Sequence, residues 1–179
     1  MLYYITKDNV LLQYSPSYIG EECKETDIIT FDELRTTPEK VIVQNGVLVL
    51  NPEWSEIELQ EAKQAKYFEA LEGAKYYIDN VAVYQFDENN SIEATDGNIG
   101  KMTAYALAFQ TGTVEVVYWT SKEDNVLTLH AEDVLNILTG LGEAQAVVWN
   151  IKFVAYKNAI NEAQTVEEVN NIVIDYSEE

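Results

Sequence analysis

The residues best suited to chemistry in this sequence are its single histidine and its single cysteine. His130 lies just before a predicted helix, and Cys23 lies in a segment that we assign to a different module. A general base needs a nucleophile within hydrogen-bond reach and a third group that orients it, and the residues around His130 supply neither. One histidine and one cysteine are also too few ligands for a zinc site. We therefore predict a helix-capping or surface role for His130, no catalytic residue and no enzymatic activity.

Two further motifs have the residue types of a ligand site but lack its spacing. Residues 87–90 and Glu93 offer alternating oxygen ligands, as calcium requires, but Ile92 stands where a calcium loop needs glycine. The Gly-Leu-Gly run at 140–142 is far from a phosphate loop, because it lies between two predicted helices, no Lys-Ser or Lys-Thr follows it, and Glu143 stands where the anion would bind. We predict a solvated hairpin tip at 87–90, a helix break at 140–142, and neither a metal nor a cofactor.

Aromatic side chains are the remaining candidates for binding. Tyrosine and tryptophan combine an apolar face with a polar edge, so they anchor protein interfaces and stack on sugars. Most of the 12 tyrosines and 3 tryptophans, including Trp149 and Tyr156 at helical spacing, are assigned to the core. Trp119 is predicted to be a surface aromatic residue. The residues predicted to bind a partner are Tyr3, Tyr4, Trp54, Ile57 and Phe68.

A long helix at 53–80 is predicted to organise the chain. Asn51 is suited to capping its first turn, and Pro52 lacks an amide hydrogen where none is needed. Its apolar residues form two stripes about a third of a turn apart. The stripes are Trp54, Ile57, Ala65 and Phe68, then Tyr67, Leu71, Ala74 and Ile78. This pattern predicts a connector whose first half docks on the preceding module or another subunit, while its second half packs on the following domain. An ordinary amphipathic helix of one domain is the alternative.

Residues 1–52 are predicted to form a β-rich attachment module. Runs of β-favouring residues at 2–6 and 10–14 predict one hairpin. Those at 41–44 and 47–50 predict another around Asn45-Gly46, a dipeptide that suits a type I′ turn. A further apolar run at 28–31 belongs to the same module. A unit of about 50 residues is marginally stable alone, so it should need the helix or a partner to bury its apolar face.

Residues 81–179 are predicted to form an α+β domain. Hairpins are expected at 81–86 with 91–94 and at 114–119 with 125–129. Helices are expected after an Asp96 cap to about residue 110, at 131–139 and at 143–163, and a short one after Thr165, which has capping-box spacing to Glu168. The whole chain is therefore predicted to be α+β, with a small β-rich N-terminal module, a long connector helix and two C-terminal β-hairpins packed on three or four helices.

Acidic residues dominate the composition, with 31 acidic and 11 basic residues and a net charge of −20. The excess of acidic residues is greatest at 81–179, which contain 16 acidic and 4 basic residues. Such a charge favours solubility and repels nucleic acid and anionic membranes. The first ten residues have no signal-peptide pattern, and no apolar run is long enough for a membrane span. We expect synthesis in the bacterial cytoplasm, no direct binding of nucleic acid and no membrane insertion.

The order of features over residues 67–170 resembles an uncharacterised domain found in tail-fibre and baseplate-neighbouring proteins of tailed phages and prophages. The features are the strand pair at 81–94, a helix, a strand ending in Tyr118-Trp119, an acidic helix start at 131–133, and a long helix leading into 159–163 and 165–169. Residues 47–52, which run into a helix rich in Glu, Gln and Lys, also resemble small tail-gene products of prophages in Gram-positive gut bacteria. The resemblance covers over half of the chain and brings no catalytic residues.

The resemblance implies a non-catalytic tail component, assembled into a virion or a phage tail-like particle. Such a component would associate with a fibre or baseplate, bind another tail protein and help to present the host-recognition parts. A second copy of the chain and a host surface glycan stay open as further partners. The alternative is a tail-fibre assembly chaperone, followed by an acidic DNA mimic that inhibits a DNA-binding protein. An enzyme acting on glycans ranks last, because no carboxylate pair stands out among so many.

Overall fold

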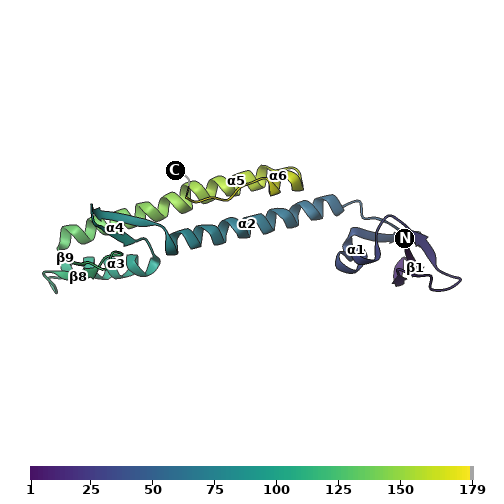
Figure 1. The fold of residues 1–179 in the computed structure, drawn as a ribbon, viewed down its shortest axis with the longest axis horizontal. Helices are drawn as coiled ribbons and strands as arrows, with labels where there is room; N and C mark the ends of the chain where they lie inside the picture. Colours follow the sequence, from purple (N-terminus) through teal and green to yellow (C-terminus); the bar gives the residue numbers. More distant parts are fainter. Residues whose placement is uncertain (178–179) are drawn as a thin grey trace. The chain divides into compact units, whose positions relative to one another are not determined.

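The computed structural model describes residues 1–177 and has the predicted α+β fold (Figure 1). The chain divides into two compact units, Met1–Glu61 and Ala62–Glu179, called here the N-unit and the C-unit. The boundary falls inside α2 (Trp54–Asn80). The helix predicted at 53–80 is therefore present, and each unit contains part of it.

The N-unit contains the two predicted hairpins. Strands β1 (Leu2–Lys7), β2 (Val10–Ser15) and β3 (Lys24–Thr26) form an antiparallel sheet in the order β2-β1-β3, and β4 (Val41–Gln44) pairs with β5 (Val47–Leu50). Asn45 and Gly46 have φ angles of 52° and 75°, which confirms the type I′ turn. The buried core of this unit consists of Leu2, Tyr4, Ile29, Leu34, Val41 and Leu48.

A short helix in the N-unit is missing from the sequence prediction. The apolar run at 28–31 leads into α1 (Phe31–Thr36), which is followed by the 3-10 turn η1 (Pro38–Lys40). Thr30 Oγ1 accepts from the amide of Glu33 at 3.2 Å, and Glu33 Oε2 accepts from the amide of Thr30 at 2.9 Å. This reciprocal capping box satisfies two amides that a helix start leaves free, so it favours helix over strand here.

The C-unit contains the other two predicted hairpins. Strand β6 (Val83–Asp87) pairs with β7 (Asn90–Glu93), and β8 (Val117–Thr120) pairs with β9 (Val126–Leu129). The two hairpins are joined at their tips, because Glu123 accepts hydrogen bonds from both the amide and the hydroxyl of Ser91. The prediction of a solvated tip holds for residues 87–89, which are exposed, but it is wrong for Asn90, which is buried and accepts from the side-chain amide of Asn125 at 3.0 Å.

The predicted helix break at 140–142 is wrong. Helix α4 (Ala131–Ala146) runs through both glycines and continues through the π-helical segment η2 (Val147–Phe153) into α5 (Val154–Glu162). Gly140 is buried, and the ring of Tyr84 occupies the space where a β-carbon would lie. The glycine thus serves close packing inside the helix, a use that local sequence does not reveal.

Two predicted helix starts differ in one detail each from those in the structure. Helix α3 (Asp96–Gln110) is capped by Thr95, whose Oγ1 accepts from the amide of Asn98 at 3.2 Å, so Asp96 already belongs to the first turn. Helix α6 (Val166–Asn170) is capped by Thr165 as predicted, but Glu168 Oε2 accepts from the amide of Gln164 instead of that of Thr165. The side chain of Glu168 thus bonds the amide one residue before the predicted one.

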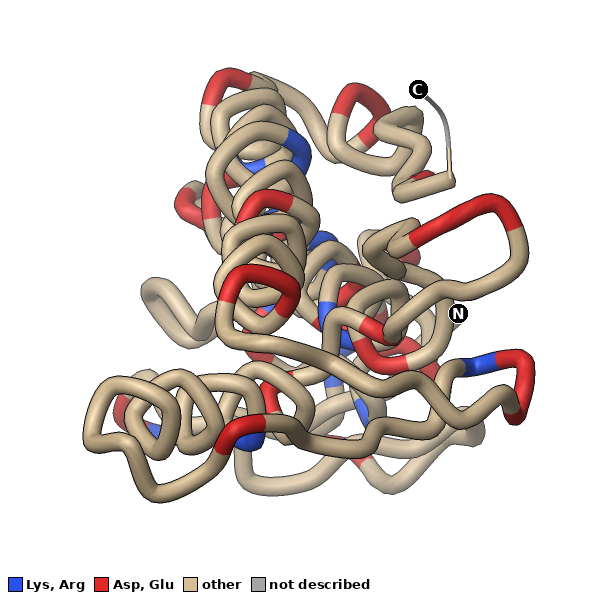
Figure 2. The backbone as a smooth tube through the Cα atoms, turned by 90° about the vertical axis from the view of Figure 1, so that its left-hand side faces the viewer, with Lys and Arg blue, Asp and Glu red and all other residues tan. Residues whose placement is uncertain are grey.

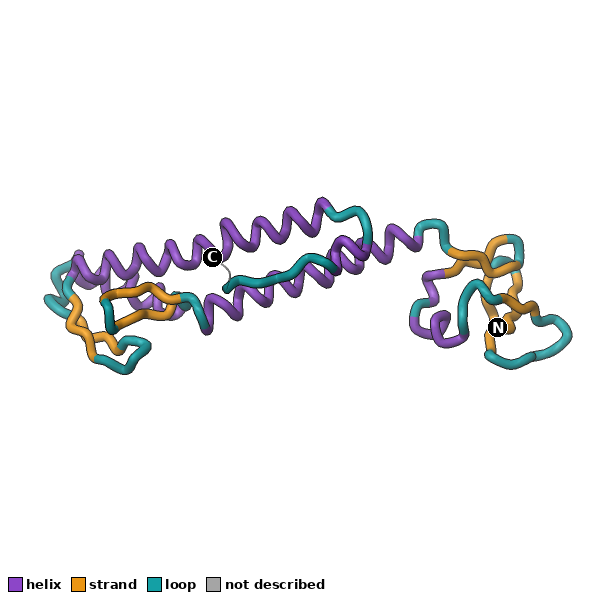
Figure 3. The backbone as a smooth tube through the Cα atoms, turned by 45° about the horizontal axis from the view of Figure 1, so that its top comes forward, coloured by secondary structure: helices purple, strands orange, loops and turns teal. Residues whose placement is uncertain are grey.

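The second half of α2 packs within the C-unit, as the sequence predicts. Figures 1 and 3 show it beside α5, with the chain after α6 returning along both helices. The buried residues at this contact are Ala74, Ile78, Val148 and Tyr176. Tyr176 also donates from its hydroxyl to the carbonyl of Ala70 at 2.8 Å, which fixes the C-terminal segment on α2. The predicted docking of the first half of α2 stays a prediction.

Candidate functional site

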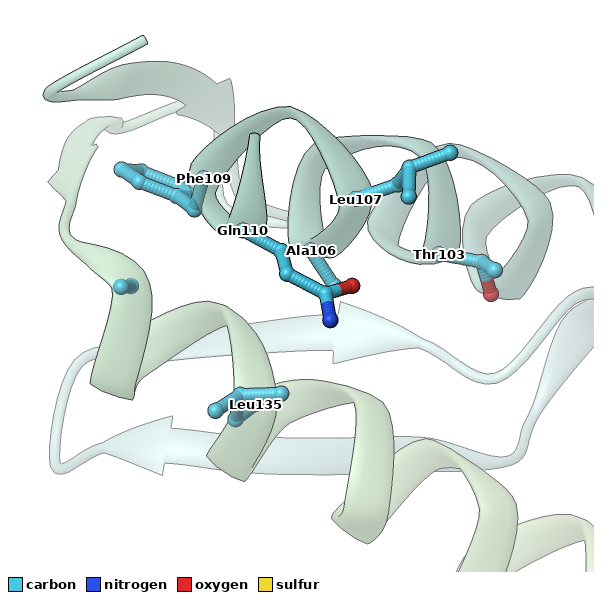
Figure 4. A pocket seen from close by; sticks show the side chains of 7 residues that line it. Thr103, Ala106, Leu107, Phe109, Gln110 and Leu135 are labelled. Carbon is cyan, nitrogen blue, oxygen red and sulfur yellow. The ribbon is translucent and has the colours of Figure 1, made fainter. Parts of the chain in front are cut away.

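An apolar groove lies between α3 and α4 of the C-unit. The two helices lie side by side and run in opposite directions, so the end of α3 faces the start of α4 (Figure 4). The groove has a volume of about 660 Å³. It is lined by Thr103, Ala106, Leu107, Phe109, Gln110, Ala131 and Leu135.

Regular helical spacing places these side chains at the groove. Thr103, Leu107 and Gln110 lie four and three residues apart, so they follow one face of α3 over two turns. Ala131 and Leu135 lie one turn apart at the start of α4. His130 lies at the N-cap of α4 and is exposed, and its backbone amide donates to Asp133 Oδ2 at 2.8 Å. The carboxylate of Asp133, and not the imidazole, therefore makes this capping hydrogen bond.

Two leucines of the groove are exposed to solvent. Leu107 is 60% exposed and Leu135 is 55% exposed, although Met102 and Val134 on the same helices are fully buried. Covering the exposed part of one leucine would contribute about 1 kcal/mol, roughly half the value of burying the whole side chain. The groove thus has apolar surface that a bound partner can remove from water.

No charged side chain lines the groove, and the charges carried by its two helices are mostly acidic. Glu132 follows Ala131 at the groove, and Asp96, Asp133 and Glu143 lie elsewhere on α3 and α4. The one basic residue of these helices, Lys101, lies on the opposite side of α3, where its Nζ is 5.6 Å from the centre of the Trp119 ring. The lining of the groove is therefore apolar and uncharged, and Glu132 is the charged residue next to it in sequence.

The groove has few polar groups in its lining. Its polar lining consists of one hydroxyl and one amide side chain, from Thr103 and Gln110. Within residues 1–177, no three or more His, Cys, Asp and Glu side chains are grouped so that they could hold a metal ion. Likewise, none of the helices in this range is both long and apolar enough for a membrane span.

Two of the predicted partner-binding residues lie in β1 on opposite faces. Tyr4 is only 3% exposed, and its hydroxyl accepts from the amide of Leu48 at 3.2 Å. This corrects the prediction for Tyr4, because alternation along the strand places it in the core with Leu2. Tyr3 is half-buried on the other face, where its ring meets the exposed Tyr18 ring edge-on at 6.0 Å.

The other aromatic and apolar residues singled out from the sequence are at least partly accessible. Trp54 and Ile57 are half-buried, and Phe68 is 52% exposed. Their role in partner binding stays a prediction. Trp119 is half-buried because Tyr105 and Lys101 cover its ring, whereas Tyr118, the residue before it in β8, is exposed.

Sequence reasoning missed Leu107 and Leu135, the two exposed residues of the groove. Neither leucine is singled out from the sequence, because both helices are interpreted only as parts of the C-terminal domain. A leucine on the otherwise polar side of two consecutive helices was the available signal. It does not by itself indicate a groove, because single exposed apolar residues are common on protein surfaces.

Comparisons with known proteins return no relative. No protein-family model matches the chain, and neither a curated protein nor a solved structure is similar to it.

Proposed function

We propose that this protein is a non-catalytic component of a phage or prophage tail that binds another tail protein through the α3–α4 groove. The observation that supports binding is the pair of half-exposed leucines, Leu107 and Leu135, in a groove without charged lining. Apolar surface that stays open on a highly charged protein is typical of protein interfaces. The tail context rests on the order of sequence features over residues 67–170.

The proposed partner inserts apolar side chains between α3 and α4. Both walls are helices anchored in the core of the C-unit, by Met102 on α3 and by Val134 and Ile137 on α4. Such walls are pre-organised, so little conformational entropy is lost when the partner binds. Tyr3, Trp54 and Ile57 of the N-unit would form a second contact, which gives one chain two attachment points within the tail.

The acidic surface supports solubility better than DNA mimicry. A mimic needs carboxylates spaced like phosphates along one surface. Figure 2 shows acidic residues on helices and loops alike, with basic residues between them. We therefore assign the net charge of −20 to solvation.

The proposal is tested by affinity purification from cells that produce the native particle. The tagged full chain is recovered, its companions are identified by mass spectrometry, and the preparation is viewed by electron microscopy. We expect fibre or baseplate proteins on tail-like particles. Recovery with a nuclease or a polymerase, or without any tail protein, would refute the proposal.

Matched variants test whether the groove makes the contact with the tail proteins. Leu107→Gln and Leu135→Gln should strongly reduce recovery of the tail proteins, because glutamine keeps helix propensity but removes the apolar contact, and only the second contact through the N-unit is left. Leu12→Gln is the control, since Leu12 is 58% exposed but lies in β2 of the N-unit. A chaperone differs from a structural component in co-expression, because it raises the yield of folded fibre, whereas a structural component does not.

A further inference from the structure

We infer that the occupant of the α3–α4 groove is a short basic amphipathic helix of the partner protein. This inference rests on the proposed function for the existence of a protein partner. It adds the secondary structure and the charge of the segment that binds.

The walls of the groove favour a helical occupant. The lining consists of side chains from two helices, whose backbone groups are hydrogen-bonded within the helices themselves. An extended peptide would find no strand edge here and would leave its own amides and carbonyls unpaired on an apolar surface. A helix satisfies these groups internally, and only its apolar stripe meets the groove.

The length of the groove fits about two turns of helix. Thr103 and Gln110 lie seven residues apart on α3, which corresponds to about 10 Å at 1.5 Å per residue. A partner helix that lies along this length presents side chains at i, i+3, i+4 and i+7. Leu107 and Leu135, one on each wall, are the residues that such a stripe would cover.

The charges around the groove favour a basic occupant. Glu132 lies next to the lining residue Ala131, and the helices of the groove also carry Asp96, Asp133 and Glu143. Lys101, the only basic residue on α3 and α4, is turned toward Trp119. Lysine or arginine on the flank of the partner helix beside Ala131 would therefore meet Glu132 without a competing cation from α3 or α4. A second copy of this chain is a poorer occupant, because it brings another net charge of −20.

The test uses four fluorescent peptides of about 14 residues, long enough for nearly four turns of helix. The first is amphipathic and basic, with leucines at helical spacing and lysines on the other face. The second has the same composition in scrambled order. The third and fourth repeat the first two with glutamate in place of lysine. Binding to the full chain is measured by fluorescence anisotropy in low salt and at 0.3 M NaCl.

The expected result is tight binding of the basic amphipathic peptide alone. Leu107→Gln and Leu135→Gln should each weaken it at least about tenfold, as truncation of an interface hot spot does. Leu12→Gln should change the affinity less than twofold. Added salt should weaken binding without abolishing it, because screening removes the charge attraction and leaves the apolar contact.

Several outcomes would overturn the inference. Equal binding of the scrambled basic peptide, or unchanged binding by the two groove variants, would mean that the acidic surface attracts cations without using the groove. Equal binding of the acidic amphipathic peptide would remove the charge preference. Binding of none of the peptides would exclude a basic helix as occupant. A dimer in solution that Leu107→Gln converts to a monomer would assign the groove to a second copy.

The inference and the proposed function fail in different experiments. If tail particles are recovered in a Leu107- and Leu135-dependent way but no peptide binds, the function stands and the occupant is not a basic helix. If the basic peptide binds at the groove but no tail protein is ever recovered, the helix-binding groove stands and the tail function fails.

Discussion

The ring of Tyr84 lies directly against Gly140, so this side chain of β6 packs on the backbone of α4. A β-carbon built on Gly140 would lie 2.0 Å from Cδ2 of Tyr84, far inside van der Waals contact. Gly142, one half-turn further along the same helix, has no atom within 4 Å of such a β-carbon. The two glycines of α4 are therefore alike in sequence but different in function.

Alanine substitutions at these glycines should change stability in opposite directions. Gly140→Ala should lower the free energy of unfolding of the C-unit by about 1–3 kcal/mol, because the ring of Tyr84 must shift. Gly142→Ala should raise it by about 0.5–1 kcal/mol, since alanine is the better helix former. Urea titrations followed by circular dichroism measure both changes. A stabilising Gly140→Ala would show that the ring moves away without loss.

Tyr176 should tie the C-terminal segment to α2 through its hydroxyl. Its ring is buried, and the hydroxyl donates to the carbonyl of Ala70 at 2.8 Å. Tyr176→Phe keeps the packing and removes this hydrogen bond, so it should lower the free energy of unfolding by about 1 kcal/mol. Tyr118→Phe is the control, because Tyr118 is exposed. Hydrogen exchange of residues 172–177 should become faster in Tyr176→Phe only.

Alkaline pH should weaken the same contact. Burial, with a smaller effect of nearby Tyr156, raises the pKa of Tyr176 from 10.0 to about 12. The folded protein then holds this proton more tightly than the unfolded chain, so the stabilisation is complete below pH 10 and is lost as the pH rises toward 12. Tyr176→Phe should lose less stability than the wild type over this range. Parallel losses in the two proteins would contradict the prediction.

Glu123 should make the hairpin junction sensitive to acid. Hydrogen bonds from the hydroxyl and amide of Ser91 lower the pKa of Glu123 from 4.5 to about 2. Its contribution to stability is therefore present above pH 4.5 and is lost as the pH falls toward 2. Glu123→Gln should be less stable than the wild type at pH 7, and the difference should vanish near pH 2. Glu88→Gln, at an exposed turn position, should show no such convergence.

Tyr4 and Tyr3 should respond differently to loss of the hydroxyl group. Tyr4→Phe removes the acceptor for the amide of buried Leu48, which should lower the free energy of unfolding of the N-unit by about 1–3 kcal/mol. Tyr3→Phe should change it by less than about 0.5 kcal/mol, because Tyr3 contributes a ring contact with Tyr18. Similar effects of the two substitutions would mean that the Tyr4 to Leu48 hydrogen bond does not stabilise the unit.

The sequence alone determined the elements whose signals are local. Asn45-Gly46 requires positive φ angles and so defines a two-residue turn, and the long run without proline defines α2. Thr165 and His130 begin helices because a cap is a contact between residues three apart. The α+β class follows from these elements, and even the missed helix α1 had a Thr-x-x-Glu signal at Thr30 and Glu33.

Tertiary structure alone decided the features that depend on residues far apart in the chain. A glycine is needed at position 140 of α4 because Tyr84, 56 positions earlier, fills the space beside it. Tyr4 belongs to the core because its hydroxyl meets the amide of buried Leu48. Side chains alternate between the two faces of β1, so Tyr3 lies on the outer face. Leu107 and Leu135 form a groove only when α3 and α4 lie together, since neither helix contains both walls. Packing of this kind depends on three-dimensional neighbours, which helical or strand periodicity does not specify.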